Sequence, residues 1–312
     1  MTFKILLRLI IFCSLALIFT AGIKTVNKNF AVEKLYSIQN YNIANLPLNT
    51  PEETTFKANP FVPILREFET SENSKIQRSN DSTKFFSQKF DARNLEVEIL
   101  TSNPEIENSE IENCKALLEK TLTTIPAKLT ISLSEIKLFF SKRNPRGLSN
   151  SHLIELRCGS LNENEIVGVF VHELGHIIDL GKMKGTSSIS SNFVDGRFKI
   201  PTDDPSVSFY RLSWQNEKKQ KALAVREDFV SGYAMSDPFE DFAESFNFYV
   251  LHGKDFRAIK KESHTLAKKY EFLKNEVFEG IEFDSMRSTK NGKRVWDSTL
   301  VEFDQADFFA QI

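Results

Sequence analysis

Residues 170–182 read FVHELGHIIDLGK and place two histidines, His172 and His176, four positions apart, with Glu173 directly after the first. Residues four apart lie on the same face of an α-helix. The flanking residues have helical periodicity, so this stretch predicts a helix with both imidazoles on one face. The opposite face carries the apolar side chains that would anchor the helix in a core: Val167, Phe170, Val171, Leu174 and Ile178.

The ends of this helix are indicated by their own residues. Asn162 is a candidate N-cap with acidic residues after it, and Gly181 is a candidate C-terminal stop. Gly175 lies in the interior, where glycine costs about 1 kcal/mol relative to alanine. We therefore expect another segment to approach the helix closely at Gly175.

The histidine spacing is typical of a metal site. The ring nitrogens of His172 and His176 can converge on one ion at about 2.0–2.1 Å. Glu173 projects about 100° round the helix from His172, beside such an ion, where a base could take a proton from an attacking water. The alternative is that these are ordinary helix residues, since a chance H-E-x-x-H is expected in on the order of one such sequence in a hundred.

A catalytic zinc ion takes three protein ligands and keeps one position open. The position six residues after His176 is Lys182, so the third ligand is expected elsewhere. The best candidates are Glu240 and Glu244, one helical turn apart in the stretch SGYAMSDPFEDFAESF. One carboxylate can bind the ion while the other orients a ligand histidine.

A structural interpretation of Glu240 stays open at this point. Asp237 and Pro238 fit the N-cap and first position of a second helix, and Glu240 then falls where a capping box places its glutamate. Asp241 points elsewhere on that helix and is the weaker ligand candidate.

The two motifs together carry a family resemblance. H-E-x-x-H followed by a distant Glu-x-x-x-Glu resembles the gluzincin group of zinc peptidases. More narrowly, HELGHIID with SGYAMSDPFEDFAESF resembles the catalytic domains of anthrax lethal factor and the Pro-Pro endopeptidases, and also predicted bacterial zinc metallopeptidases. The likeness covers roughly residues 172–249. About sixty residues separate the two motifs, which is longer than in those enzymes and suggests an insertion in the polar stretch after Lys182.

The resemblance implies a role for each matching position. His172, His176 and Glu240 would bind one catalytic Zn²⁺ ion, and Glu173 would be the general base. Tyr233, seven residues before Glu240, would donate a hydrogen bond to the developing oxyanion; its alternative is a core aromatic beside Phe229. Glu244 would not bind the ion itself but would orient a ligand histidine. Asp179 would either orient a ligand histidine in the same way or form an ion pair at the surface.

The predicted fold class is α+β. The resemblance implies a zincin-like domain with a small mixed sheet, the H-E-x-x-H helix and a mostly helical C-terminal half. Residues 94–100 and 151–158 alternate as strands, the second being either an edge that pairs with substrate or an internal strand. The remaining expected elements are a helix over 110–125, a strand followed by a turn or helix over 127–140, a helix from Pro238 to Gly253, a charged helical stretch over 255–278 with a solvated lysine face, and a hairpin around Asn291 and Gly292.

The N-terminus predicts export. Lys4 and Arg8 precede an uncharged run over residues 9–23, which fits a signal peptide or an uncleaved membrane anchor over 1–22. Residues 23–89 are polar and proline-interrupted, as in a linker, and residues 90–312 form the expected catalytic domain. Cys114 and Cys158 could pair or remain free thiols.

Composition narrows the function. The formal charge of −2 leaves no broad basic field, so nucleic-acid binding is disfavoured, and the 28 phenylalanines favour a globular protein. We expect a monomeric, secreted or cell-surface zinc endopeptidase acting on a protein or peptide substrate, with a possible membrane tether at the N-terminus. The alternative is a non-catalytic zinc-containing binding module at the cell surface.

Overall fold

The computed structural model describes residues 84–90, 95–101, 106–140, 145–285 and 294–311. All of them belong to one compact unit. The expected export segment over 1–22, almost all of the expected linker and the expected hairpin around Asn291 lie outside the described residues. Among the described helices, none combines the length and the apolar character that a membrane crossing requires.

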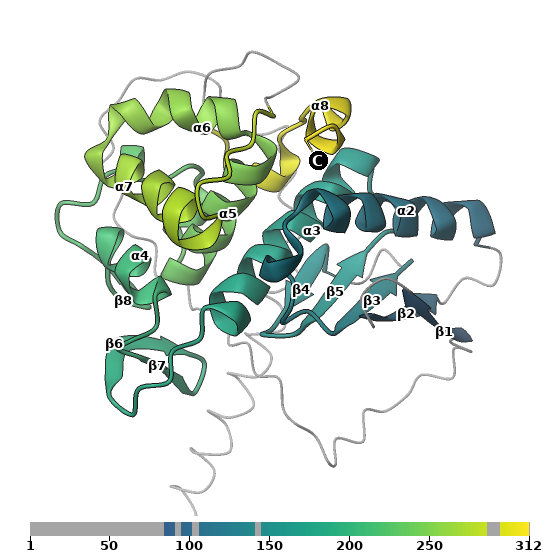
Figure 1. The fold of residues 1–312 in the computed structure, drawn as a ribbon, viewed down its shortest axis with the longest axis horizontal. Helices are drawn as coiled ribbons and strands as arrows, with labels where there is room; N and C mark the ends of the chain where they lie inside the picture. The colour runs from purple at the N-terminus through teal and green to yellow at the C-terminus, as the bar shows by residue number, and fades with distance from the viewer. Residues whose placement is uncertain (1–83, 91–94, 102–105, 141–144, 286–293, 312) are drawn as a thin grey trace, which may run out of the picture. The chain divides into compact units, whose positions relative to one another are not determined.

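A small mixed sheet of five strands forms the first half of the domain (Figure 1). The order across the sheet is β1, β2, β3, β5, β4; the three inner strands are parallel and both outer strands are antiparallel to their neighbours. The expected α+β class with a small mixed sheet is therefore what the structure has. The strands are β1 (Lys84–Phe90), β2 (Leu95–Thr101), β3 (Glu135–Phe139), β4 (Gly147–Ser149) and β5 (Leu153–Arg157).

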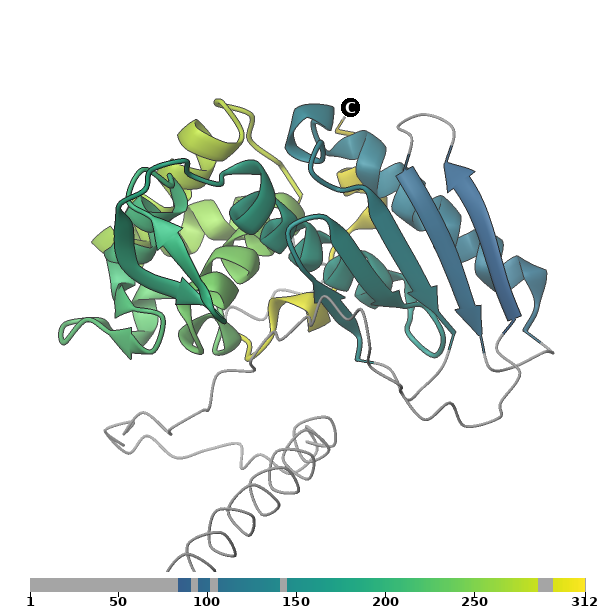
Figure 2. The same ribbon diagram turned by 90° about the horizontal axis from the view of Figure 1, so that it is seen from below.

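Two helices lie on one face of this sheet, α2 (Asn108–Thr124) and α3 (Glu163–Ile177), as Figure 1 and Figure 2 show. Buried residues alternate with more exposed residues along β2, as the sequence predicts. A disulfide joins Cys114 on α2 to Cys158 just after β5. Of the two alternatives for these cysteines, the structure has the paired one.

Three expectations about these elements were wrong. Over 127–140 the order is reversed, because a short 3₁₀ turn, η2 (Ala127–Leu129), precedes β3. The strand within 151–158 is β5, which is internal, so its edge alternative is wrong; β4 is the edge. The helix α3 does not stop at Gly181, because the chain continues from Ile177 into a π-helical turn, η3 (Ile178–Lys182), and a side chain at Gly181 would collide with the carbonyl of Ser151.

The second half is mostly helical, as expected. The polar stretch after Lys182, suggested as an insertion, forms a hairpin of β6 (Ser190–Asp195) and β7 (Phe198–Pro201). A second small hairpin pairs β8 (Trp214–Asn216) with β9 (Lys219–Gln220). The helices are α4 (Ser206–Ser213), α5 (Pro238–Leu251), α6 (Gly253–Ile259), α7 (His264–Phe272) and α8 (Gln305–Phe309), with short turns η4 (Arg226–Asp228), η5 (Tyr233–Met235), η6 (Lys260–Glu262), η7 (Leu273–Val277) and η8 (Ser298–Leu300).

The stretch over 255–278 is not one solvated helix. It is divided among α6, η6, α7 and η7, and Lys269 on α7 is fully buried. Its ammonium group contacts the buried carboxylate of Asp241 on α5 at 2.6 Å. The lysine pattern predicts a solvated face because periodicity does not reveal a charge partner on another helix. Gly253 likewise begins α6 and does not end α5, which closes at His252.

The crossing of α3 and α5 positions the functional residues. Every residue of α5 is buried, so this helix runs through the middle of the C-terminal half. A β-carbon at Gly175 would lie 2.9 Å from the Cα of Ala243 on α5, closer than packed side chains allow. The expected close approach at Gly175 is thus confirmed, and the second helix is the segment that makes it.

Candidate metal centre

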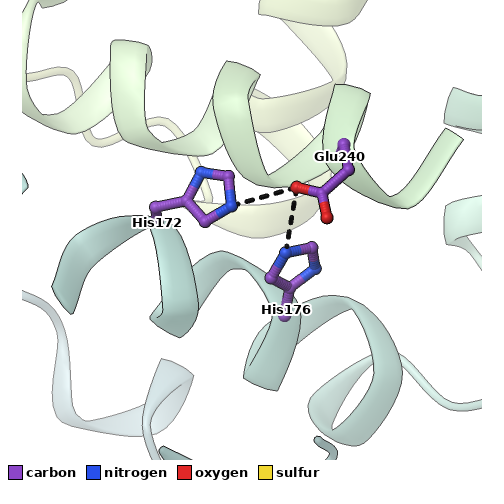
Figure 3. A group of neighbouring side chains, drawn as sticks. All are labelled: His172, His176 and Glu240. Carbon is purple, nitrogen blue, oxygen red and sulfur yellow. Dashed lines mark hydrogen bonds and ion pairs between the residues drawn. The ribbon is translucent and has the colours of Figure 1, made fainter. Parts of the chain in front are cut away.

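Three side chains from the two crossing helices meet at one point (Figure 3). The Nε2 atom of His172 lies 3.1 Å from Oε2 of Glu240, and Nε2 of His176 lies 3.4 Å from the same oxygen. One donor atom from each residue lies within 4.8 Å of the other two. Both histidines point away from α3 toward the first turn of α5, where Glu240 lies.

The local sequence explains why Glu240 is at this position. Asp237 caps α5 by accepting hydrogen bonds from the N–H groups of Phe239 and Glu240, and Pro238 occupies the first helical position. The cap predicted from the sequence is therefore present. The carboxylate of Glu240 nevertheless faces both histidines, so capping alone does not describe this residue.

His172 and Glu240 stabilise each other's charged forms. Burial lowers the pKa of His172, but hydrogen bonds and charge interactions with Glu240 and Glu244 outweigh it and raise that pKa well above its usual range. Burial raises the pKa of Glu240, whereas the two histidines lower it, and the net pKa lies well below the usual range. Glu240 is thus a carboxylate at neutral pH, the form in which it can bind a cation.

Glu244 contacts the other nitrogen of His172. Its Oε1 atom lies 2.9 Å from Nδ1, and the carboxylate is completely buried. When a cation displaces the proton on Nε2 of His172, a proton held on Nδ1 by Glu244 leaves the Nε2 lone pair for that cation. This arrangement can orient His172 toward a cation shared with His176.

Glu173 follows His172 directly on α3, and its side chain contacts the edge of the sheet. Its Oε2 accepts a hydrogen bond from the hydroxyl of Ser149 at 2.5 Å. Gly147, two residues earlier on β4, has no room for a β-carbon because the side chains of Glu173 and Val169 occupy that space. Sequence reasoning missed both residues, since β4 is only three residues long and carries no periodic signal.

Tyr233 lies on the short turn η5, next to the cluster. Its ring centroid is 6.1 Å from that of His172, and its side chain is half-buried. Phe229, the neighbour expected from the core interpretation, packs against Trp214. The Tyr233 N–H donates to the carbonyl of Trp296 at 2.6 Å, so the C-terminal segment fixes this turn.

Two acidic residues named from the sequence contact other parts of the molecule. Asp179 is buried and accepts a hydrogen bond from the hydroxyl of Tyr210 at 2.6 Å, so its surface ion-pair alternative is wrong. Asp241 contacts Lys269 and accepts from the indole N–H of Trp214. Asp241 therefore stabilises the packing of α5 and is not part of the cluster.

The donor set fits a divalent cation. Two imidazole nitrogens and one carboxylate oxygen match the three protein ligands of a catalytic zinc site. Catalytic zinc sites also have a carboxylate next to a ligand histidine, here Glu173, and a carboxylate that contacts the other nitrogen of a ligand histidine, here Glu244. The mixed fold and this cluster are consistent with an α+β metallopeptidase domain.

Comparison with known proteins agrees with this class. Residues 156–296 match the model of a family described as "Putative zinc-binding metallo-peptidase". The match contains all three cluster residues together with Glu173, Tyr233 and Glu244. No curated protein and no solved structure matched the chain. The comparisons support a metallopeptidase family, and the narrower likeness to anthrax lethal factor receives no support from them.

Proposed function

We propose that this protein is an exported zinc-dependent endopeptidase of the gluzincin type. The observation that carries the proposal is the convergence of His172, His176 and Glu240 from two helices, within a region similar to a zinc-binding metallopeptidase family. Export is proposed from the basic and apolar N-terminal residues, and the disulfide between Cys114 and Cys158 is compatible with an oxidising compartment.

The residues beside the cluster have complementary roles in this proposal. Zinc, held by the three ligands, would supply a Lewis acid that makes an attacking water acidic at neutral pH. Glu173 would take the proton from that water and later give it to the leaving amine. Tyr233 would donate a hydrogen bond to the oxygen of the tetrahedral intermediate. Glu244 would hold His172 in the tautomer that binds the ion.

The edge strand β4 supports a proposed position for the substrate. Arg146 and Asn150 pair their backbones with β5, so by alternation Gly147 and Ser149 direct their own backbone N–H and C=O groups away from it. An extended peptide could add to this edge as a further strand. The side chain of Ser149 contacts Glu173, so such a peptide would pass beside the proposed base.

Peptide hydrolysis with the purified full chain tests the proposal. We expect cleavage of members of a peptide library, loss of cleavage on adding a chelator, and recovery on adding zinc. Glu173→Gln should bind one zinc ion and lose at least about 1,000-fold in kcat. Glu163→Gln, an exposed change on the same helix, is the matched control and should leave activity unchanged.

A different result would favour the non-catalytic binding module. That function predicts one bound zinc ion per chain and no cleavage of any peptide by the wild-type protein. The presence of Glu173 disfavours the binding-module function, because a purely structural zinc site does not require a base beside the ion. Undiminished cleavage by Glu173→Gln would overturn the proposed mechanism.

A further inference from the structure

Glu244 is held by two serines, Ser231 and Ser298, to which the sequence analysis gives no role. Its Oε1 contacts Nδ1 of His172, and its Oε2 accepts two hydrogen bonds, from the Ser231 hydroxyl at 2.5 Å and from the Ser298 backbone N–H at 2.9 Å. The three residues that contact this carboxylate come from three separate parts of the chain. All of the side chains concerned are buried.

The hydroxyl of Ser231 is oriented by a second hydrogen bond. Its oxygen accepts from the N–H of Ala234 at 3.0 Å, so its own hydrogen is directed at Glu244. Ser231 also precedes Gly232 and Tyr233, whose N–H groups donate to the carbonyls of residues 295 and 296. Residues 295–298 therefore contact both the turn that carries Tyr233 and the carboxylate of Glu244.

Ser298 contributes its backbone and not its side chain. Its N–H is the donor to Glu244, whereas its buried hydroxyl has no hydrogen-bond partner among the described residues. Asp297, which caps the turn η8, forms an ion pair with Arg146 next to the edge strand β4. This ion pair helps to fix the position of the Ser298 N–H.

We propose that Ser231 and the backbone N–H of Ser298 are positioning groups of the metal centre, and that residues 295–299 are part of this centre. The proposal rests on the proposed zinc site. With both donors on Oε2, the carboxylate of Glu244 cannot rotate, so Oε1 keeps its contact with Nδ1 of His172. A fixed Nδ1–H keeps the Nε2 lone pair directed at the ion.

Zinc affinity of the full chain, measured by competition with a chelating dye, tests Ser231. Ser231→Ala should weaken zinc binding about tenfold, within the range found for outer partners of zinc ligands. Ser231→Thr keeps the hydroxyl and should restore most of the affinity. Ser245→Ala is the matched control, because Ser245 is equally buried beside Glu244 on α5 and its hydroxyl has no partner among the described residues.

Ser298 allows the amide to be tested separately. Ser298→Pro removes the N–H at the first position of η8, where proline is tolerated, and the preceding Asp297 has the extended backbone (φ −133°, ψ 121°) that proline requires. We expect it to weaken zinc binding about tenfold. Ser298→Ala removes only the unpartnered hydroxyl and should bind zinc as the wild type does.

The outcomes are separable from those of the proposed function. Unchanged zinc affinity in both Ser231→Ala and Ser298→Pro would overturn the inference, as would equal losses in the Ser245→Ala and Ser298→Ala controls. Wild-type protein that binds zinc but cleaves no peptide would overturn the peptidase proposal and leave this comparison valid. Wild-type protein that binds no zinc would overturn both.

Discussion

At the scale of single residues, His172 shows how the site is organised. Its two ring nitrogens contact two different carboxylates, Glu240 on one side and Glu244 on the other. The carboxylates lie one turn apart on α5, so a single helix presents both. A ligand and the group that orients it are thereby positioned by the same element.

The first prediction concerns the proposed ligand Glu240. Glu240→Ala removes the carboxylate shared by both histidines and should weaken zinc binding by about 100-fold or more, beyond what loss of an outer partner costs. Zinc should also raise the melting temperature of the wild type in a concentration-dependent way and that of the variant far less. Calorimetric titration and thermal melts check this, and equal affinity in both proteins would rule out Glu240 as a ligand.

The second prediction concerns Asp179 and pH. Burial is the main cause that raises the pKa of this carboxyl well above its ordinary range. The folded protein then holds a proton that the unfolded chain releases, so its stabilising contribution is complete below about pH 4 and is lost as pH rises through the folded pKa. Asp179→Asn cannot titrate and still accepts from Tyr210. Its free energy of unfolding should therefore fall less over that window.

Denaturant unfolding at a series of pH values, with chelator present throughout, measures this difference. The comparison is between wild type and Asp179→Asn, so titration of the other groups cancels to first order. Parallel pH profiles for the two proteins would show that Asp179 is not protonated in the folded state.

At the scale of secondary-structure elements, the site depends on how closely α3 and α5 approach. Gly175 allows the contact with Ala243, and this contact brings the face with the histidines to the first turn of α5. The edge strand β4 contributes in the same way, since Gly147 and Ser149 both adjoin Glu173. Small residues at these points set the distances between the elements.

The third prediction is that Gly175→Ala destabilises the protein. Alanine is favoured over glycine in a helix by about 1 kcal/mol, but the added methyl would lie 2.9 Å from the Ala243 Cα, which is backbone and cannot rotate away. Overpacking of this kind costs about 1–3 kcal/mol, so the net change should be unfavourable. Chemical denaturation measures it, and a gain in stability would show that the two helices are further apart.

The fourth prediction concerns the buried pair between α5 and α7. Lys269→Met leaves the carboxylate of Asp241 buried without its cation and should cost about 3–5 kcal/mol. Adding Asp241→Asn removes that charge while an acceptor for the Trp214 indole N–H remains. The double variant should therefore regain most of the loss, which a double-mutant cycle from denaturation curves will quantify. Equal stability of the single and double variants would contradict a charge effect.

At the scale of the whole molecule, four segments that are separated in the sequence assemble the site. The sheet contributes its edge, the two crossing helices contribute the cluster, and the C-terminal segment over 295–299 reaches back to Glu244 and Tyr233. The disulfide joins α2 to the end of β5, shortly before α3 begins. The support for the histidine helix is thus linked covalently as well as by packing.

The fifth prediction concerns this disulfide. It closes a sequence separation of 44 residues, for which the chain-entropy relation gives about 4 kcal/mol of stabilisation. The Cys114→Ser, Cys158→Ser double variant should lose stability of this order in denaturation experiments. Mass spectrometry after alkylation in denaturant without reductant should find both cysteines of the wild type protected. Labelling of both would contradict the pairing.

Much of the fold and of the candidate site could be predicted from local patterns. The histidine helix, its Asn162 cap, the Asp237 cap of the second helix and the close approach at Gly175 are all as expected. Each depends on residues within about one helical turn, where periodicity and capping chemistry operate. The sequence by itself therefore determined that these two helices form and which of their faces carry His172, His176 and Glu240.

Only the tertiary structure decided how distant segments meet. Ser149 reaches Glu173 across 24 positions, Ser298 reaches Glu244 across 54, and Lys269 is buried by a partner 28 positions away. The strand order, with β5 internal and β4 at the edge, is equally non-local. The physical reason is that local hydrogen bonding follows from neighbouring residues, whereas these contacts arise from the packing of whole elements, which no short pattern encodes.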